Sequence, residues 1–317
     1  MLSGNAGVAG GRLAVDLCGI RLRNPIIAAS GTCAYGLEME GLVDWSKVGG
    51  LVVKGLSIEP IAGNPPPRIC ETYGGMVNSI GLQNIGVRRF IEEKAPKLAR
   101  LSTSVFANVF GYAVEDYVEV VAALEDAPGL AGYELNVSCP NTKHGGMFFS
   151  SEPRLLAEVV SAVKRRARRP VIVKLSPNVA RIEPLAAAAE EAGADAISLV
   201  NTFLALAVDV RTRRPRIGAG FGGLSGPAIK PIALRLVYEA VRAVRIPVIG
   251  LGGISTGADA AEFLIAGARA VQVGTASFWD PGATARIAGE LDRFLSEEGI
   301  ERVSSLIGTL QFGDARQ

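Results

Sequence analysis

Eight short apolar runs, most of them followed by an alanine-rich segment of helical period, are the feature that most constrains this fold. The runs are continuously apolar, which is typical of parallel strands covered on both faces. We expect strands at Ile26–Ala29, Leu51–Lys54, Val105–Val109, Tyr133–Val137, Val171–Leu175, Ala196–Val200, Val248–Leu251 and Ala270–Val273. Eight such βα units are the number that a closed barrel needs.

An open, doubly wound parallel sheet is the competing architecture. Polar residues and glycines follow nearly every run at its carboxyl end, which is where barrels carry their chemistry. We therefore expect an α/β protein in which residues 1–317 form a single (β/α)8 TIM barrel domain.

Three further segments are predicted around the barrel. Arg12–Asp16 and Ile20–Arg23 flank Cys18-Gly19 and predict a small N-terminal hairpin. Ser57–Gln83 and Phe203–Pro227 interrupt the repeating pattern, and such long connections are usually functional. We expect both to be long loops over the barrel mouth.

Composition excludes several classes of partner. Hydrophobic residues make up 49% of the chain and the net charge is +2, so we expect a large core and no nucleic-acid partner. The four cysteines, Cys18, Cys33, Cys70 and Cys139, form no CxxC pair, which argues against a bound metal, a cluster or a disulfide framework and favours a cytoplasmic protein. No basic start precedes an apolar run and no run is long enough to span a bilayer, so no membrane partner is expected.

The segment Asn136-Val-Ser-Cys139-Pro-Asn141 follows the fourth run and predicts a loop at the barrel mouth. A single cysteine is more often a buried structural residue, but a Ser-Cys-Pro-Asn turn does not continue a strand and presents its thiol to the mouth. The one histidine, His144, lies on the same loop, where a protease-like Cys–His pair is rarely fixed. The pKa of an unperturbed cysteine thiol is about 8.5, so Cys139 is better suited to act as a general base than as the nucleophile of a Cys–His pair.

Polar side chains end five of the runs. Lys54 and Lys174 each close a run, and although one such lysine would be unremarkable at a barrel rim, two indicate an anionic ligand. Asn108, Asn136 and Asn201 close three others. Neutral amides around one mouth suit a planar heterocycle with carbonyl and N–H edges.

Glycine-rich turns follow the last two runs, as Gly250-Leu-Gly252-Gly253 and Gly274-Thr275. Their spacing is not that of the dinucleotide-binding GxGxxG motif. Barrels commonly bind a phosphate with the backbone amides of these two loops. The sequence therefore predicts a cofactor that carries a phosphate.

These motifs resemble class 1 dihydroorotate dehydrogenases and, within them, the catalytic FMN subunit of the B type. The resemblance runs from about Leu13 to the final helices, and its most specific segments are Asn24–Gly31, Lys54-Gly55 with Glu59-Pro60, Gly63–Arg68, Asn78–Asn84, and Asn136–Asn141 followed by Lys143–Gly146. It implies oxidation of dihydroorotate to orotate in pyrimidine (UMP) biosynthesis. Cys139 would remove the C5 proton while a hydride passes from C6 to the flavin, and Lys174 would lie near N1 of the ring.

The resemblance also implies the site residues, with one FMN per chain and no metal. FMN contacts are expected from Ser30, Lys54, Gly55, Asn108, Asn136, Lys174, Val200, Gly226, Gly252, Gly253, Gly274 and Thr275. Substrate contacts are expected from Lys54, Asn78, Ser79, Ile80, Gly81, Leu82, Asn136, Asn201 and Thr202.

B-type enzymes further imply a partner subunit that carries FAD and an iron–sulfur cluster and passes electrons to NAD. A homodimer and a heterotetramer with that subunit both fit the family. The segment Cys70-Glu-Thr-Tyr-Gly-Gly75 departs from the pattern associated with the B type.

Three other functions compete with this interpretation. The flavin barrel of a dihydropyrimidine dehydrogenase shares the Asn-x-Ser-Cys-Pro loop. A Schiff-base aldolase would use Lys174 with the phosphate site for a sugar phosphate. A noncatalytic flavin-binding subunit would have no use for a positioned base.

Overall fold

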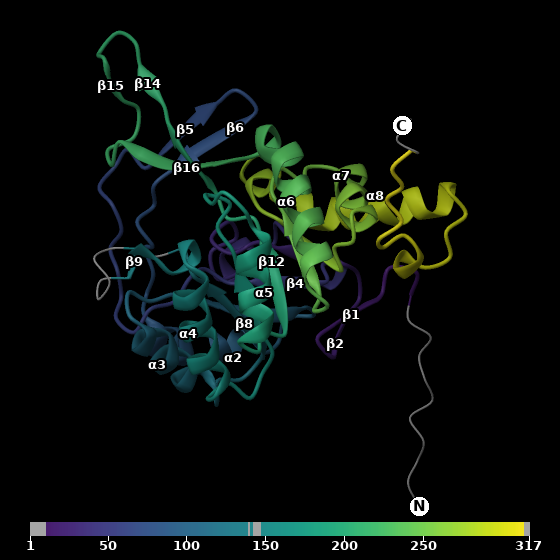
Figure 1. The fold of residues 1–317 in the computed structure, drawn as a ribbon, viewed down its shortest axis with the longest axis horizontal. Helices are drawn as coiled ribbons and strands as arrows, with labels where there is room; N and C mark the ends of the chain where they lie inside the picture. The colour runs from purple at the N-terminus through teal and green to yellow at the C-terminus, as the bar shows by residue number, and fades with distance from the viewer. Residues whose placement is uncertain (1–10, 139, 142–146, 314–317) are drawn as a thin grey trace, which may run out of the picture.

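Eight parallel strands close into a barrel in the computed structural model, which describes residues 11–138, 140–141 and 147–313 (Figure 1). In order around the barrel they are β11 (Val171–Lys174), β12 (Ala196–Leu199), β17 (Val248–Leu251), β18 (Ala270–Val273), β3 (Ile26–Ala28), β4 (Gly50–Val52), β7 (Ser104–Val109) and β8 (Leu130–Asn136). Each of the eight predicted runs forms one of these strands, with small differences at the ends. The predicted (β/α)8 barrel is confirmed.

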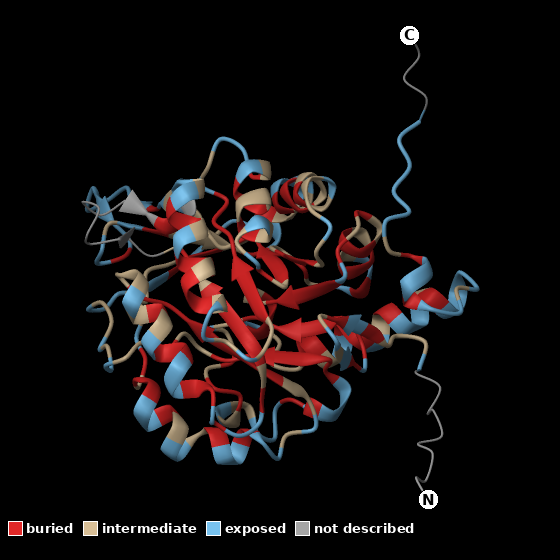
Figure 2. Ribbon diagram, turned by 60° about the horizontal axis from the view of Figure 1, so that its bottom comes forward, coloured by how far each residue is buried: buried red, intermediate tan, exposed pale blue. Residues whose placement is uncertain are grey.

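Helices surround the barrel and turn their buried faces toward it (Figure 2). They are α1 (Val87–Glu93), α2 (Ala95–Leu98), α3 (Val114–Leu124), α4 (Pro153–Lys164), α5 (Glu183–Glu191), α6 (Lys230–Ala243), α7 (Gly257–Ile265) and α8 (Ala283–Glu297). Short 3-10 turns lie at η1 (Leu37–Met39), η2 (Trp45–Lys47), η4 (Phe149–Ser151), η5 (Pro227–Ile229), η6 (Thr275–Phe278) and η7 (Val303–Ser305). Within the described ranges, none of the helices has both the length and the apolar character needed to cross a membrane.

Local sequence explains where these helices begin. In α7, the Thr256 side chain accepts a hydrogen bond from the Asp259 amide, and the Asp259 carboxylate accepts one from the Thr256 amide, which is a capping box. In α4, Pro153 occupies the first turn, where its missing N–H costs nothing. The buried face of α4 then follows the helical period through Leu156, Val159 and Val163.

The N-terminal hairpin is present and shorter than predicted. It pairs β1 (Val15–Leu17) with β2 (Ile20–Leu22) in antiparallel register. Cys18 and Gly19 both have positive φ, 55° and 80°, as a two-residue turn of type I′ requires.

The two long interruptions contain short strands that were not predicted, and a strand of the first pairs with a strand of the second. The structure has β5 (Ile69–Thr72) and β6 (Gly75–Asn78) in the first interruption, and β13 (Phe203–Leu206) and β16 (Phe221–Ser225) in the second. They form one antiparallel sheet in the order β13-β16-β6-β5. β5 and β6 are neighbours in sequence, but β6 also pairs with β16, which lies far away in sequence, and no local pattern could show that pairing.

Two small strand pairs complete the mouth side of the molecule. β14 (Val208–Asp209) and β15 (Arg214–Pro215) form a hairpin that projects beyond β16 (Figure 1). β9 (Pro140–Asn141) pairs with β10 (Met147–Phe148) in antiparallel register. The second pair brackets part of the predicted catalytic loop.

Candidate active site

The carboxyl ends of β8 and β11 bring predicted site residues side by side. Lys174, the last residue of β11, is in register with Asn136, the last residue of β8. Asn201, just after β12, donates from Nδ2 to Asn136 Oδ1 at 3.1 Å and to Ser138 Oγ at 3.0 Å. The Thr202 amide donates to Asn201 Oδ1 at 2.8 Å. The structure therefore places three of the predicted substrate residues, Asn136, Asn201 and Thr202, in one hydrogen-bonded cluster.

Lys174 lies beneath this cluster and is almost completely buried. Its Nζ donates to Ser30 Oγ, after β3, at 3.1 Å, so two predicted FMN residues meet across the barrel. The same Nζ lies 3.5 Å from Glu134 Oε1. This lysine side chain is thus held at the mouth by contacts to Ser30 and Glu134.

Lys54 follows β4 and is half-buried. Burial, and secondarily the nearby guanidinium of Arg68, lowers the pKa of Lys54. Arg68 also donates to Gln83 Oε1 at 2.8 Å. Two cations beside each other on this side of the site favour an anionic ligand, and Arg68 is a functional candidate that sequence reasoning included only as part of a motif.

Gly55 and Asn108 lie against each other. A Cβ on Gly55 would stand 3.0 Å from Asn108 Oδ1 and 3.0 Å from the Phe110 ring, so a larger residue would push the chain out of place. Asn108 is buried and donates from Nδ2 to Glu134 Oε1 at 2.8 Å. Both predicted residues therefore belong to the packed floor beside Lys174.

The loops after β12, β16, β17 and β18 converge on another side of the mouth. A Cβ on Gly252 would lie 3.2 Å from Val200 Cγ2, and one on Gly253 would lie 2.9 Å from the Gly226 carbonyl oxygen. Thr275 Oγ1 donates to Ser225 Oγ, the neighbour of Gly226, at 2.8 Å. The predicted residues Val200, Gly226, Gly252, Gly253, Gly274 and Thr275 all lie in these loops.

Backbone amides in these loops are available to a ligand. The residues Gly253, Gly274 and Thr275 are half-buried, and their N–H groups make no hydrogen bond to any described residue. Unpaired amides shielded from solvent are costly unless an acceptor reaches them. A phosphate is such an acceptor, so the residues present fit the phosphate of FMN.

The segment from Asn78 to Leu82 forms a rigid turn at the end of β6. Asn64 donates from its amide to the Ile80 carbonyl at 3.0 Å and from Nδ2 to Ser79 Oγ at 2.7 Å. Gly81 and Leu82 have positive φ, 74° and 55°. Asn78 Nδ2 donates to the Gly223 carbonyl at 3.2 Å, and Gly223 is packed so tightly on Thr202 that it has no room for a side chain. The turn is thereby tied to the Asn201–Thr202 cluster.

Cys139 lies outside the described residues, as do Lys143 and His144 of the same loop. Its neighbour Ser138 is described, and the Ser138 hydroxyl accepts the hydrogen bond from Asn201 noted above. The role of Cys139 as a base stays a prediction.

Glu134 was missed by sequence reasoning. It is fully buried inside the barrel and accepts hydrogen bonds from Asn108, Ser198 and Gln272. The signal was present, because an acidic residue stands inside a run of apolar residues, two positions before Asn136 and so on the same face of the strand.

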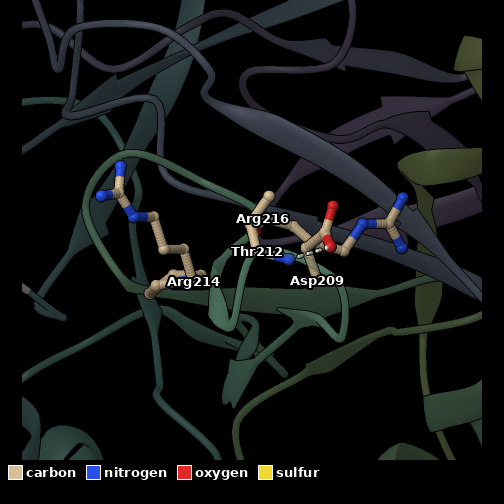
Figure 3. Close-up of a pocket in the computed structure, with 5 residues that line it drawn as sticks. Asp209, Thr212, Arg214 and Arg216 are labelled. Carbon is tan, nitrogen blue, oxygen red and sulfur yellow. Dashed lines mark hydrogen bonds between the residues drawn. The ribbon is translucent and has the colours of Figure 1, made fainter.

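A separate hollow of about 580 Å³ opens on the projecting hairpin and holds none of the predicted residues (Figure 3). Its lining consists of Asp209, Thr212, Arg214, Pro215 and Arg216. The Asp209 carboxylate caps the turn, accepting from the amides of Arg211 at 2.9 Å and Thr212 at 3.0 Å. Within the described ranges there is also no group of three or more side chains suited to hold a metal ion.

Fold and site together define a class of protein: a (β/α)8 barrel with glycine-rich loops after its last two strands and a mouth lined by amide and lysine side chains. The family model for dihydroorotate dehydrogenase matches residues 12–295. The chain belongs to the dihydroorotate dehydrogenase family and is an oxidoreductase.

Curated relatives cover nearly the whole chain. A protein of Solibacter usitatus named "Putative dihydroorotate dehydrogenase A (fumarate)" is 71% identical over 95% of this chain and 99% of its own length. The proteins of Geobacter metallireducens and Geobacter sulfurreducens named "Dihydroorotate dehydrogenase B (NAD(+)), catalytic subunit" are 53% and 52% identical, each over 94% of this chain and 98% of its own length. The predicted family is confirmed.

Proposed function

We propose that this chain oxidises dihydroorotate to orotate in pyrimidine (UMP) biosynthesis, with one FMN bound at the barrel mouth. One observation carries the proposal: the amides of Gly253, Gly274 and Thr275, which have no acceptor among the described residues, lie in loops of the same barrel mouth as Lys174 and the Asn136–Asn201 pair. The first group suits a phosphate, and the second suits a planar ring with carbonyl and N–H edges.

Bound FMN supplies the acceptor for the hydride that leaves C6 of the substrate. The glycine loops after β17 and β18 hold its phosphate. Ser30, Gly55, Asn108 and Lys174 would hold the ring, and the Lys174 side chain would stabilise negative charge on it.

Dihydroorotate is an anion with a cyclic amide framework. The charge of Lys54 binds its carboxylate, and Asn78, Asn136 and Asn201 bind the carbonyl and N–H edges of the ring. The rigid turn of Ser79, Ile80, Gly81 and Leu82 presents further backbone groups. Cys139 takes the proton from C5 as a general base.

An anaerobic absorbance spectrum tests this function directly. We expect the purified chain to be yellow and its flavin band to bleach when dihydroorotate is added, because hydride transfer reduces the ring. Uracil in the same assay separates a dihydropyrimidine dehydrogenase from this enzyme. A yellow protein that ignores dihydroorotate would show that the substrate is wrong.

The aldolase alternative has less support. A Schiff-base lysine must present a free amine to a carbonyl, whereas Lys174 Nζ donates to Ser30 Oγ and lies 3.5 Å from the buried carboxylate of Glu134. A colourless protein that loses activity with borohydride and a sugar phosphate would reverse this judgement.

For the electron acceptor we propose NAD, reached through a partner subunit that carries FAD and an iron–sulfur cluster, in a cytoplasmic heterotetramer built on a homodimer. Several relatives named as B-type catalytic subunits support this assignment. Fumarate is a second candidate, because the relative that is 71% identical is named as the fumarate type.

The isolated chain distinguishes the two acceptors. When the isolated chain is given dihydroorotate and either NAD or fumarate, we expect little NADH and little succinate to form. NADH should form only after a partner subunit is added. Rapid NADH formation by the single chain would remove the need for a partner. Rapid succinate formation would assign the chain to the fumarate type.

A further inference from the structure

Glu134 is a fully buried carboxylate in the barrel, and the reaction described above gives it no task. It stands on β8 directly opposite Asn108 of β7. A buried carboxylate costs several kcal/mol of free energy unless hydrogen bonds and a counter-charge compensate it. The hydrogen-bond partners and the counter-charge of Glu134 therefore indicate its role.

Both oxygens of Glu134 are fully used. Oε1 accepts from Asn108 Nδ2 at 2.8 Å and lies 3.5 Å from Lys174 Nζ. Oε2 accepts from Ser198 Oγ at 2.9 Å and from Gln272 Nε2 at 2.6 Å. Four strands other than its own, β7, β11, β12 and β18, thus converge on one carboxylate.

Lys174 is the one charged side chain among the described residues that pairs with Glu134. The groups that face the carboxylate from β7, β12 and β18 are a neutral amide, a hydroxyl and a neutral amide, and Ser30 faces the lysine from the loop after β3. Lys174 is itself only 5% exposed. Glu134 and Lys174 therefore act as counter-charges for each other, which lowers the free-energy cost of burying both side chains.

We propose that Glu134 is a positioning residue that keeps Lys174 protonated and fixed in the proposed FMN site. This inference rests on the proposed FMN site. Glu134 does not touch substrate; it acts through Lys174, whose positive charge must already be present when the reduced ring becomes an anion.

Proton uptake on reduction distinguishes this role of Glu134 from a purely structural one. If Glu134 holds Lys174 in its charged form before and after reduction, the anionic reduced ring takes up one proton with two electrons. In Glu134→Gln the buried lysine loses its counter-charge, and burial then favours its neutral form. Reduction of the ring now draws a second proton onto Lys174.

The experiment is to measure the midpoint potential of bound FMN at a series of pH values across the neutral range. We expect the slope of potential against pH in Glu134→Gln to be twice that of the wild-type chain. Glu134→Asp, which retains the charge, should keep the wild-type slope. An unchanged slope in Glu134→Gln would overturn the proposal.

Glu134→Gln is a suitable variant because the network can adapt to it. The Ser198 hydroxyl can reverse its direction, and Gln272 Oε1 is buried without a partner among the described residues, so it can accept from the new amide. If the variant still fails to fold, the double variant Glu134→Gln, Lys174→Met tests whether the unpaired charge of Lys174 is the cause. Recovery of the fold in the double variant supports the pairing, and failure to recover shows that Glu134 serves the neutral donors instead.

Glu125→Gln is the matched control. Glu125 is also a buried carboxylate, but it accepts from Tyr133 Oη at 3.0 Å and from Arg168 Nε at 2.7 Å, on the other face of β8. We expect this variant to lose stability without changing the slope. A wild-type chain that binds no FMN would overturn the proposed function itself, and with it this inference. If wild type and all variants bind FMN and show the same slope of potential against pH, the inference alone is overturned.

Discussion

Cys139→Ser is expected to slow the reduction of bound flavin by dihydroorotate by about 10²- to 10⁴-fold, the usual contribution of a general base. A serine hydroxyl ionises far less readily than a thiol, so it removes the C5 proton poorly near neutral pH. Stopped-flow absorbance under anaerobic conditions measures this step. FMN should remain bound, because Cys139 is not among the residues proposed to contact it.

Cys18→Ser is the control for this experiment. Burial, followed by the nearby carboxylates of Asp195 and Asp16, raises the pKa of Cys18 to about 12, and its thiol donates to the Asp195 carbonyl at 3.1 Å. This cysteine lies in the turn of the N-terminal hairpin and should leave the rate unchanged. A near-normal rate in Cys139→Ser would remove Cys139 from the mechanism.

Lys54→Gln is expected to weaken dihydroorotate binding by about 10- to 100-fold, because a hydrogen bond to a charged group contributes about 1.5–3 kcal/mol. Titration of the oxidised enzyme with orotate, followed by the flavin spectrum, gives the corresponding affinity without turnover. The second cation, Arg68, should preserve part of the binding.

The same lysine predicts a pH dependence. Only protonated Lys54 attracts the carboxylate, and its pKa is lowered by burial and by Arg68. Affinity should therefore fall as pH rises, and the fall should begin at a lower pH than for an exposed lysine, which titrates near about 10.4. Lys54→Gln should show no such fall.

Lys164→Gln is the matched control for Lys54. Lys164 pairs with Asp195 at 2.6 Å at the end of α4, which places it beside Cys18 and away from the mouth residues. Its replacement should leave orotate affinity and its pH dependence unchanged. Equal affinities in wild type and Lys54→Gln would contradict the proposed role of Lys54.

The barrel itself was predictable because it depends on local pattern. Continuously apolar runs such as Val171–Lys174, each followed by a helical segment, can be buried on both faces only in a parallel sheet with helices outside. Lys174 and Asn136 each stand at the carboxyl end of a strand, and all carboxyl ends of a barrel meet at one mouth. Their position in the sequence was therefore enough to predict that both lie there.

The sheet over the mouth was not predictable in this way. β6 pairs with β16 through Val77 and Leu224, residues that lie in different interruptions of the barrel pattern. Strands of four or five residues carry too little periodicity to show a partner so far away. Only the folded chain brings them together and so ties Asn78 to Gly223 and Thr202.

The sequence by itself determined the fold class, the family and the kinds of side chain at the mouth, because those follow from local pattern and short motifs. The tertiary structure alone decided that Glu134 lies within reach of Lys174, Ser198 and Gln272 from three other strands. The physical reason is that compensation of a buried charge depends on distances of a few ångströms between residues far apart in the chain, and closure of the barrel sets those distances.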